Sequence, residues 1–469
     1  MKKYFSPVHV GIIIALSFVS LLHFFSYILE VSVPSAVLKG SRLLFISTLI
    51  WLAVKRKSLT TWILISMVIG AEIGNDLPSF AVNLQIFSKI FLRMIKTIIA
   101  PLLFATLVVG IAGHSNLKQV GRMGWKSILY FELISTIALF IGLIAINISR
   151  AGVGITLPPV AEAPVEEVQK QTIQEIILHV FPENLARAIY EGQVLQIVVF
   201  SILFGIAVAM LKEEHKKPMI RFSESLAETM FKFTNLIMLF APVAVGAAIA
   251  YTVGHMGLGV LVNLFKLLMT LYVALIAFML FVLLPVAHFF KIPVKRFVQA
   301  VAEPTTIAFA TTSSESALPR AMENMEAFGV PRKIVAFVLP TGYSFNLDGT
   351  TLYLSLASIF VAQAAGIHLS FGQQVVMMLT LMLTSKGVAG VPRASLVILL
   401  GTAVSFGLPV EPIFIILGID ELMDMARTSV NVIGNCLASA AVARWEGELD
   451  TSKPLTLGEN GNPVEEISG

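Results

Sequence analysis

Apolar segments of about 20 residues, set one after another between short basic clusters, limit most strongly what this chain can fold into. A helix of that length crosses the hydrocarbon core of a bilayer, and its backbone polar groups are satisfied within the helix. We expect such spans at roughly 8–29, 38–54, 59–76, 86–112, 127–148, 187–211, 227–253 and 258–290. The sequence therefore predicts an all-α polytopic membrane protein.

The composition agrees with this class. Of the 469 residues, 56% are hydrophobic and 13% are charged, whereas soluble domains carry about 25% charged residues. The single cysteine, Cys436, excludes a disulfide framework and a cysteine-based metal site. A cleaved signal peptide is the alternative for the N-terminus, but its apolar run is too long for that and further spans follow.

Basic clusters indicate the orientation of the spans. They are Lys2 with Lys3; Lys55, Arg56 and Lys57; Lys118, Arg122 and Lys126; Lys212, Lys216, Lys217 and Arg221; Lys291, Lys295 and Arg296; and Arg332 with Lys333. Because an even number of spans separates them up to Arg296, the positive-inside rule puts them and both termini in the cytoplasm. The polar loop 149–186 then lies outside. Between Arg296 and Arg332 the chain leaves and returns to one side, as a re-entrant hairpin does.

The pattern changes from Phe297 to Trp445, where Gly, Pro, Ser, Thr and Asn interrupt the apolar stretches. Irregular backbone at membrane depth is tolerated only when it is buried in protein or lines a cavity. We therefore expect the functional residues in this part of the chain.

The last helix carries a polar stripe. Its members are Asp420, Asp424, Arg427, Thr428, Asn431 and Asn435. At 100° per residue they lie within about 60° of Asp424, on an otherwise apolar helix. A charged side chain at mid-membrane costs about 2.5–3.5 kcal/mol, so such residues face a cavity or a partner. The alternative is a purely structural ion pair between Asp424 and Arg427.

Two segments have apolar arms on either side of a polar tip. The first, about 297–330, has hydroxyl residues from Thr311 to Ser316 at its tip, where helix N-termini offer N–H groups to a carboxylate. The second, about 372–408, has its tip at 384–395 and enters from the opposite side. The alternatives are an ordinary Ser/Thr loop in solvent for the first and an exposed loop for the second.

Between the two hairpins, the span 333–365 is interrupted at 342–350. Asn346, Asp348 and the freed carbonyls are hard oxygen donors, which suit Na⁺ or a proton relay. A helix kink with satisfied polar groups is the alternative. Another intramembrane carboxylate, Glu132, is either an interfacial residue or a proton carrier.

With these motifs in order, the sequence resembles the dicarboxylate/amino acid:cation symporter family. Four segments match the motifs of this family: the serine-rich tip, 346–350, 387–392 and 424–435. The resemblance covers about residues 59–447. It implies a homotrimer with a fixed scaffold and an elevator-like transport domain, about ten transmembrane helices and two re-entrant hairpins. The implied parts are an added helical pair, 1–57; scaffold helices, 58–126; a transport-domain helix, 127–148; an extracellular loop, 149–186; scaffold and trimerisation helices, 187–254; the transport domain, 255–447; and a disordered cytoplasmic tail, 448–469.

The resemblance also implies roles for single residues. Arg427 would bind the side-chain carboxylate of an acidic amino acid, and Asp424 would accept from its ammonium group. The implied substrate-binding set is Thr312, Ser314, Thr350, Val391, Ser395, Asp424, Arg427, Thr428 and Asn431. The implied set for cation or proton coupling is Glu132, Ser135, Gly342, Ser344, Asn346, Asp348, Ser385, Asn431 and Asn435. Within it, Na⁺ could bind at Gly342, Asn346, Asp348, Asn431 and Asn435.

Departures from the family pattern bear on the coupling ion. Sodium-coupled archaeal relatives have Met, Asp and Thr where this chain has Leu347, Asn435 and Ile134, so sodium-site ligands are missing here. Arginine at the first tip of some relatives is Thr312 here, and a glycine of the second tip is Arg393, for which we have no account. The retained carboxylates Glu132, Glu315 and Asp348 are the candidate proton carriers, since a low-dielectric site favours the protonated form.

The sequence thus predicts a bacterial inner-membrane symporter that imports glutamate and aspartate with protons and needs no cofactor. Its expected partners are the acidic amino acid, the co-transported cation, the lipid bilayer and two further copies of the chain, without nucleic acid. Sodium coupling, or plain C4-dicarboxylates as substrates, are the alternatives. An intramembrane enzyme is disfavoured because no histidine lies near the serine cluster to activate a nucleophile. A channel is disfavoured because a pore does not need two hairpins that close on one site.

Overall fold

The computed structural model describes residues 7–28, 32–112, 117–155, 181–191, 194–384 and 394–452. Within these ranges every regular element is a helix. The chain divides into two compact units, Met1–Phe91 with Met238–Leu258, and Leu92–Ile237 with Gly259–Gly469.

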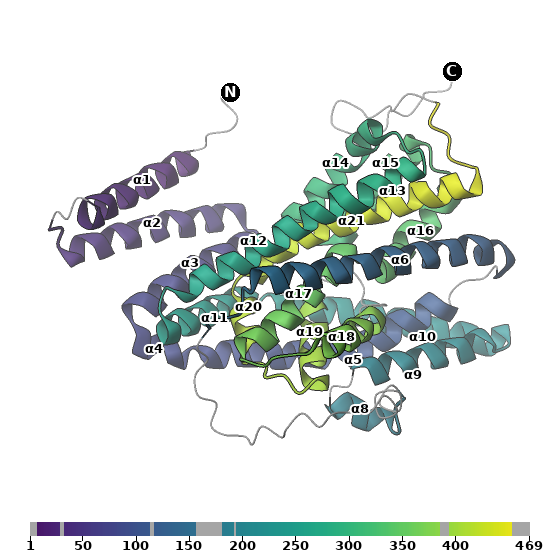
Figure 1. Ribbon diagram of the computed structural model, residues 1–469, viewed down its shortest axis with the longest axis horizontal. Helices are drawn as coiled ribbons and strands as arrows, with labels where there is room; N and C mark the ends of the chain where they lie inside the picture. The colour runs from purple at the N-terminus through teal and green to yellow at the C-terminus, as the bar shows by residue number, and fades with distance from the viewer. Residues whose placement is uncertain are drawn as a thin grey trace. The chain divides into compact units, whose positions relative to one another are not determined.

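The first unit joins the N-terminal helices to one helix from the middle of the chain. Its helices are α1 (Pro7–Tyr27), α2 (Ser35–Arg56), α3 (Leu59–Asp76), α4 (Pro78–Asn83), the start of α5 (Gln85–Ala112) and α11 (Ala241–Met256). Residues 70 and 246 let α3 and α11 touch through their backbones: a Cβ on Gly70 would collide with the carbonyl of Gly246. Figure 1 shows α1 and α2 as an antiparallel pair.

An ion-pair cluster joins α2 to α3. Arg42 donates from Nε to Glu72 Oε1 at 2.8 Å and from Nη2 to Asp76 Oδ1 at 3.0 Å. Half-buried carboxylates at the end of an apolar helix need such a partner, which α2 supplies. The helical pair expected at 1–57 therefore forms as helices and is bound to α3.

The orientation of this pair can be tested by cysteine labelling. Gly40 is exposed at the start of α2, and a Cβ there would meet no atom within 4 Å. We expect an impermeant maleimide added outside right-side-out vesicles to label Gly40→Cys, because the positive-inside rule predicts a cytoplasmic position for the basic end of α2 at Arg56. Arg56→Cys is the matched control and should react only after permeabilisation. Labelling of Gly40→Cys from the cytoplasmic side alone would refute the two added spans.

The second unit contains the remaining helices. They are the rest of α5, α6 (Leu117–Ser149), α8 (Leu185–Glu191), α9 (Val194–Ala209), α10 (Glu213–Met238), α12 (Val260–Phe278), the π-helical turn η1 (Met279–Leu283), α13 (Leu284–Phe289), α14 (Val294–Thr311), α15 (Ser314–Phe328), α16 (Arg332–Phe345), α17 (Asp348–Ala364), α18 (Phe371–Thr384), α19 (Ala394–Ser405), α20 (Glu411–Leu417) and α21 (Asp420–Glu446).

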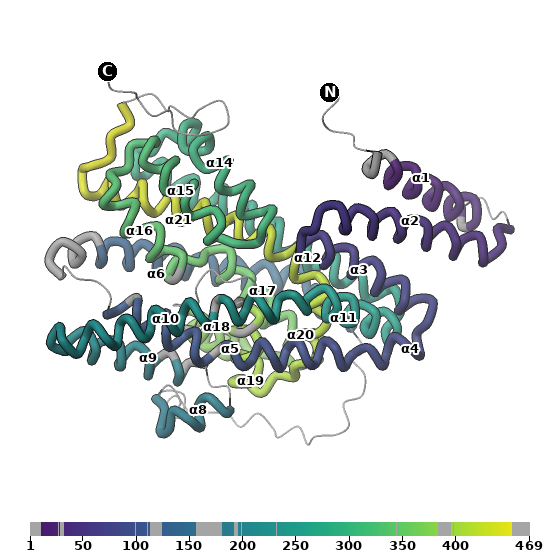
Figure 2. Tube along the Cα trace, turned by 180° about the vertical axis from the view of Figure 1, so that it is seen from behind, coloured from purple at the N-terminus to yellow at the C-terminus, as the bar shows by residue number. Residues whose placement is uncertain are grey.

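Helix α17 lies at the core of this unit, with almost every side chain buried. It packs along α6, where a Cβ on Gly142 would collide with the Ser355 hydroxyl and the Leu352 carbonyl. Figure 2 shows α14, α15, α16 and α21 gathered near the C-terminus. The polar stripe of α21 is therefore enclosed by helices from the interrupted part of the sequence.

Four helical stretches in the described part of the chain are long and apolar enough to cross a membrane: Ser35–Arg56, Pro78–Val109, Gly124–Ser149 and Val260–Phe289. Glu213–Met238 and Ala241–Met256 make a fifth if they count as one broken span. The expected 227–253 span is divided between α10 and α11, and the expected 187–211 span includes parts of α8 and α9, with residues 192–193 outside the described part. The count of about ten stays a prediction, since helices of the interrupted region are short or carry buried polar residues.

The expected hairpin at 297–330 is a helix–turn–helix. Helix α14 ends at Thr311, and its C-cap Thr312 has a left-handed φ of 51°. Ser313 caps α15 by accepting from Ser316 N at 3.3 Å. Asn324 Nδ2 donates to the Ala300 carbonyl at 2.9 Å and ties the arms together. In the second hairpin, α18 and α19 are the arms, and the tip at 385–393 lies outside the described residues.

The prediction that the tail is disordered from residue 448 is wrong for its first residues. Asp450 N donates to the Gly329 carbonyl at 3.0 Å, Arg296 Nη1 donates to the Thr451 carbonyl at 2.6 Å, and Lys333 pairs with Glu448 at 2.8 Å. Polar composition gave no sign of this, because these contacts join the tail to residues far away in the chain. Residues 453–469 lie outside the described part.

Candidate functional site

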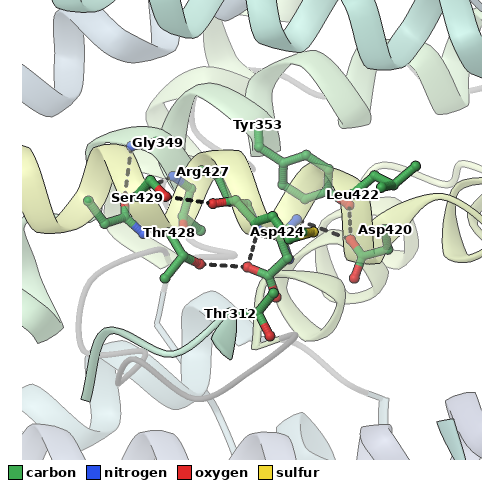
Figure 3. A network of polar contacts seen from close by, with 12 residues as sticks. Thr312, Gly349, Tyr353, Asp420, Leu422, Asp424, Arg427, Thr428 and Ser429 are labelled. Carbon is green, nitrogen blue, oxygen red and sulfur yellow. Dashed lines mark hydrogen bonds and ion pairs between the residues drawn. The ribbon is translucent and has the colours of Figure 1, made fainter. Parts of the chain in front are cut away.

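Arg427 is the centre of a buried ionic network on α21. Its Nε donates to Asp424 Oδ1 at 2.9 Å and its Nη1 donates to Asp420 Oδ1 at 3.0 Å. Only 1% of Arg427 is exposed. Thr428 Oγ1 donates to the same Asp424 oxygen at 2.8 Å. Figure 3 shows these side chains along one face of the helix, which agrees with the predicted stripe.

Tyr353 of α17 fixes the plane of the guanidinium. The Arg427 Cζ lies 4.2 Å from the centroid of the Tyr353 ring, and Tyr353 OH donates to Asp420 Oδ1 at 3.2 Å. A cation stacked on an aromatic face is stabilised by the ring quadrupole, more so away from water. The guanidinium is therefore held in one orientation by groups on two helices.

The network leaves polar atoms unsatisfied among the described residues. Arg427 Nη2 and Asp424 Oδ2 are buried and have no hydrogen-bond partner there. A buried polar atom left without a partner costs about 1–3 kcal/mol. The structural ion pair considered as an alternative is thus present, yet it leaves one donor and one acceptor for a ligand.

Asn431 joins α21 to the N-terminus of α17. Its Oδ1 accepts from Gly349 N at 2.8 Å and Thr350 N at 3.2 Å, and its Nδ2 donates to Thr350 Oγ1 at 2.9 Å. The amide therefore supplies an N-cap from another helix. Gly349 permits this contact, because a Cβ there would collide with the Arg427 carbonyl.

The hairpin tips supply further candidates. Thr312 and Ser314 are buried, and Figure 3 places Thr312 at the Asp424 end of the network. Ser395, in the first turn of α19, is buried, and its hydroxyl has no hydrogen-bond partner among the described residues. Val391 lies outside the described residues. Helix α15 begins at the first tip, so its free N–H groups are there to meet an anion.

A second buried polar cluster lies where α16 breaks into α17. Asn346 Nδ2 donates to Asp348 Oδ2 at 3.3 Å and to Asn435 Oδ1 at 3.2 Å, and Ser135 Oγ donates to Asp348 Oδ1 at 3.4 Å. All four side chains are fully buried. Asn346 Oδ1 has no partner among the described residues. The cluster offers oxygen ligands to a small hard cation, or a carboxylate to a proton.

Two glycines make room for this cluster. A Cβ on Gly342 would collide with the Asn435 side chain, and a Cβ on Gly434 would collide with the Asp348 carboxylate. Gly342 is therefore needed for the close packing of α16 against Asn435, in addition to the cation-binding role predicted for it. Among the described residues no group of three or more His, Cys, Asp or Glu side chains could hold a metal ion.

The other residues predicted to take part in cation or proton coupling lie outside the two polar clusters or outside the described residues. Ser385 and the side chain of Ser344 lie outside what the structure describes. Glu132 is half-buried on α6, three residues before Ser135 and thus on nearly the same face. The side chain of Glu315 is exposed on the first turn of α15, whereas its neighbours Ser314 and Ala317 are buried, and its role as a proton carrier stays a prediction.

Sequence reasoning missed Tyr353. It read Asp420 as part of the stripe without giving it a role, although Asp420 binds the guanidinium together with Tyr353. The available signal was spacing: Tyr353 follows Thr350 by three residues, so both lie on the α17 face toward α21.

Comparison with known proteins agrees with this site. Residues 59–445, which include both polar clusters, match the sodium:dicarboxylate symporter family. The chain belongs to this family. Relatives include the proton/sodium-glutamate symport protein of Bacillus caldotenax, 42% identical over 85% of this chain and 97% of that protein. The proton/glutamate-aspartate symporter of Escherichia coli K12 is 42% identical over 85% of this chain and 95% of that protein.

Family members that are named for C4-dicarboxylates are nearly as similar to this chain as those named for glutamate. The C4-dicarboxylate transport protein of Solibacter usitatus is 39% identical over 87% of this chain and 97% of that protein. Overall identity therefore does not choose between amino acids and plain dicarboxylates. The charges and hydrogen-bonding groups of the site therefore distinguish between these two substrate classes.

Proposed function

We propose that this chain is a secondary active symporter that imports L-glutamate and L-aspartate across the bacterial inner membrane, driven by protons. The observation that carries the proposal is the pair of unsatisfied atoms on α21, Arg427 Nη2 and Asp424 Oδ2. An acidic amino acid offers a carboxylate to the first and an ammonium group to the second. Planar guanidinium matches a carboxylate in geometry as well as charge.

Plain C4-dicarboxylates suit this site poorly. A dianion would bring a second carboxylate close to Asp424 without an ammonium group to neutralise it. Like charges in a low-dielectric site repel strongly, and a buried carboxylate without a cation is costly. Asp424 therefore favours the amino acid over succinate or fumarate.

The transport cycle that we propose follows the family pattern. Three copies form a trimer through a fixed scaffold, and the hairpins, α16, α17 and α21 move as an elevator-like transport domain. About ten helices span the membrane, and both termini are cytoplasmic. The ion-bound state of the Asn346–Asp348–Asn435 cluster would stabilise the start of α17, and thereby the Asn431 cap next to the substrate.

The coupling ion is proposed to be a proton. Asn435 accepts from Asn346 and carries no charge, so Asp348 is the only carboxylate among the four described side chains of the cluster, which are those of Ser135, Asn346, Asp348 and Asn435. These side chains bring a single carboxylate to a bound Na⁺, which leaves its other oxygen ligands to uncharged groups. Asp348 can instead be neutralised by protonation, which favours burial in apolar surroundings.

Uptake under imposed gradients tests this proposal. We expect proteoliposomes to accumulate labelled glutamate when only a pH gradient, acidic outside, is imposed in sodium-free choline buffer. One proton balances the monoanionic substrate, and each further cation adds about 2.3 kcal/mol of driving force per 100 mV. Uptake that requires sodium and ignores the pH gradient would overturn proton coupling and leave the sodium alternative.

Asn435→Asp provides a matched variant for the same question. It places a second carboxylate against Asn346 Nδ2, beside Asp348, where two like charges need a bound cation. We expect sodium to stimulate uptake by this variant and to have little effect on the parent. Equal sodium dependence in the two proteins would contradict the role assigned to this cluster.

A further inference from the structure

Behind the ionic network lies an apolar cavity that the proposed transport function does not use. Its volume is about 390 Å³. Residues of α12, η1, α14 and α21 form its walls: Tyr272, Leu275, Ile276, Met279, Thr305, Thr306, Phe309, Ala426, Ser429, Val430 and Ile433. This is within the size range of pockets that hold small molecules.

The cavity lies on the opposite face of α21 from the polar stripe. Its α21 wall is formed by positions 426, 429, 430 and 433, and the site residues occupy 424, 427, 428 and 431. The two sets have the same spacing and differ by a shift of two residues, or about 200° around the helix. One helix thickness therefore separates the cavity from Arg427.

The other walls place the cavity at the depth of the hydrocarbon. The span Val260–Phe289 supplies residues 272–279, near its middle, while the exposed Lys266 lies toward one end. The mouth is marked by the exposed lining residues Ile276, at 49%, Phe309, at 41%, and Thr306. Around it the outer face of α12 is apolar, with Val262, Phe265 and Val273 exposed.

Water is a poor occupant of this cavity. The hydroxyls of Thr306 and Ser429 donate to carbonyls of their own helices, to Ala302 at 2.8 Å and to Met425 at 2.9 Å. Among the described lining residues, the Thr305 hydroxyl is a buried group without a hydrogen-bond partner. A buried water needs two to four polar partners, and an apolar cavity that lacks them stays dry.

The π-helical turn contributes to the shape of the cavity. Met279, a lining residue, is the first residue of η1. Pro285 has no N–H to donate and its ring crowds the carbonyl four residues earlier, which a wider turn relieves. The helix is therefore locally wider where the cavity opens, and such turns are frequent at functional sites.

We propose that this cavity is a binding site for one acyl chain of a membrane phospholipid. The chain enters between Ile276 and Phe309 and fills the space between α14 and α21. Lipid tails are the most concentrated apolar groups at this depth, and filling a void restores the dispersion contacts that its lining otherwise lacks. Because α14 leads from Phe309 directly to the Thr312 tip, the bound chain supports the hairpin from behind.

Photolabelling tests this site directly. Full-length protein is reconstituted in vesicles of phosphatidylethanolamine and phosphatidylglycerol that contain a phospholipid with a diazirine at mid-chain, and adducts are mapped by mass spectrometry. We expect adducts on Ser429 and Val430, which are only 7% and 3% exposed and can be reached only from inside the cavity. Adducts on Val262 report ordinary contact with the bilayer.

Variants that fill the cavity complete the test. Ala426→Phe and Thr305→Leu fill it from opposite walls, so a folding defect in one leaves the other informative. Each should lower the adducts at Ser429 and Val430 about tenfold, while Val262→Phe, on the outer face of α12, leaves them unchanged. Adducts confined to the outer face of α12, or equal labelling of Val430 in all variants, would show bilayer contact only and overturn the proposal.

Discussion

Arg427→Lys is expected to weaken binding of both glutamate and aspartate at least about thirtyfold, which corresponds to about 2 kcal/mol. Lysine keeps the positive charge between Asp420 and Asp424, but it loses the planar pair of donors and the stack on Tyr353. The Nη2 atom that we assign to the substrate carboxylate has no equivalent in lysine. Calorimetric titration of the purified protein with aspartate measures the change.

Lysine is preferred to a neutral replacement for a structural reason. A neutral residue would leave two buried carboxylates without their cation, which lowers the stability of the fold by about 3–5 kcal/mol. A loss of binding could then not be separated from a loss of folding. Arg444→Lys is the matched control on the same helix, because Arg444 lies near the end of α21, outside the ionic network, and donates to the Lys291 carbonyl. Aspartate affinity equal to that of the parent in Arg427→Lys would refute the assignment.

Asp424→Asn should lower the affinity for glutamate and aspartate about a hundredfold, because the ammonium group loses a charged acceptor worth about 3 kcal/mol in a buried site. The fold should persist: Arg427 keeps Asp420 as its partner, and Thr428 can still donate to the side-chain oxygen. Competition against bound aspartate and succinate, measured in the same preparation, reports the effect.

Succinate is the internal control for this variant. It has no ammonium group, so it loses nothing when Asp424 becomes neutral, and it is freed from the repulsion of that carboxylate. We expect the preference for aspartate over succinate to shrink or reverse. A uniform loss of affinity for both ligands would indicate damage to the site in general, and would contradict the role of Asp424 as the ammonium acceptor.

Much of the fold could be predicted because membrane helices follow simple rules of length and periodicity. The bounds expected for 59–76 and 86–112 agree with α3 and α5 to within one residue. The hairpin at 297–330 and the break near Asn346 were predicted from polar residues at a depth where backbone groups need partners. Similarly, a helical period of 100° was enough to place Asp424, Arg427 and Thr428 on one face.

What the sequence could not give were contacts between distant segments. Nothing local indicates that Asn431 caps α17 or that Tyr353 stacks on Arg427, since both contacts depend on how α17 packs on α21. The order of residues 448–452 was misjudged for the same reason. A polar composition indicates that a segment can lie in water, whereas its order and burial depend on the residues that contact it from elsewhere in the chain.

The most direct measurement of the central claim is competition for uptake by the parent protein. Proteoliposomes are given an inward pH gradient and labelled aspartate, with unlabelled glutamate or succinate added in excess. The site predicts that glutamate abolishes accumulation and that succinate leaves it nearly unchanged, because only an amino acid has a group for Asp424. Equal competition by succinate, or accumulation of labelled succinate itself, would contradict an acidic amino acid symporter.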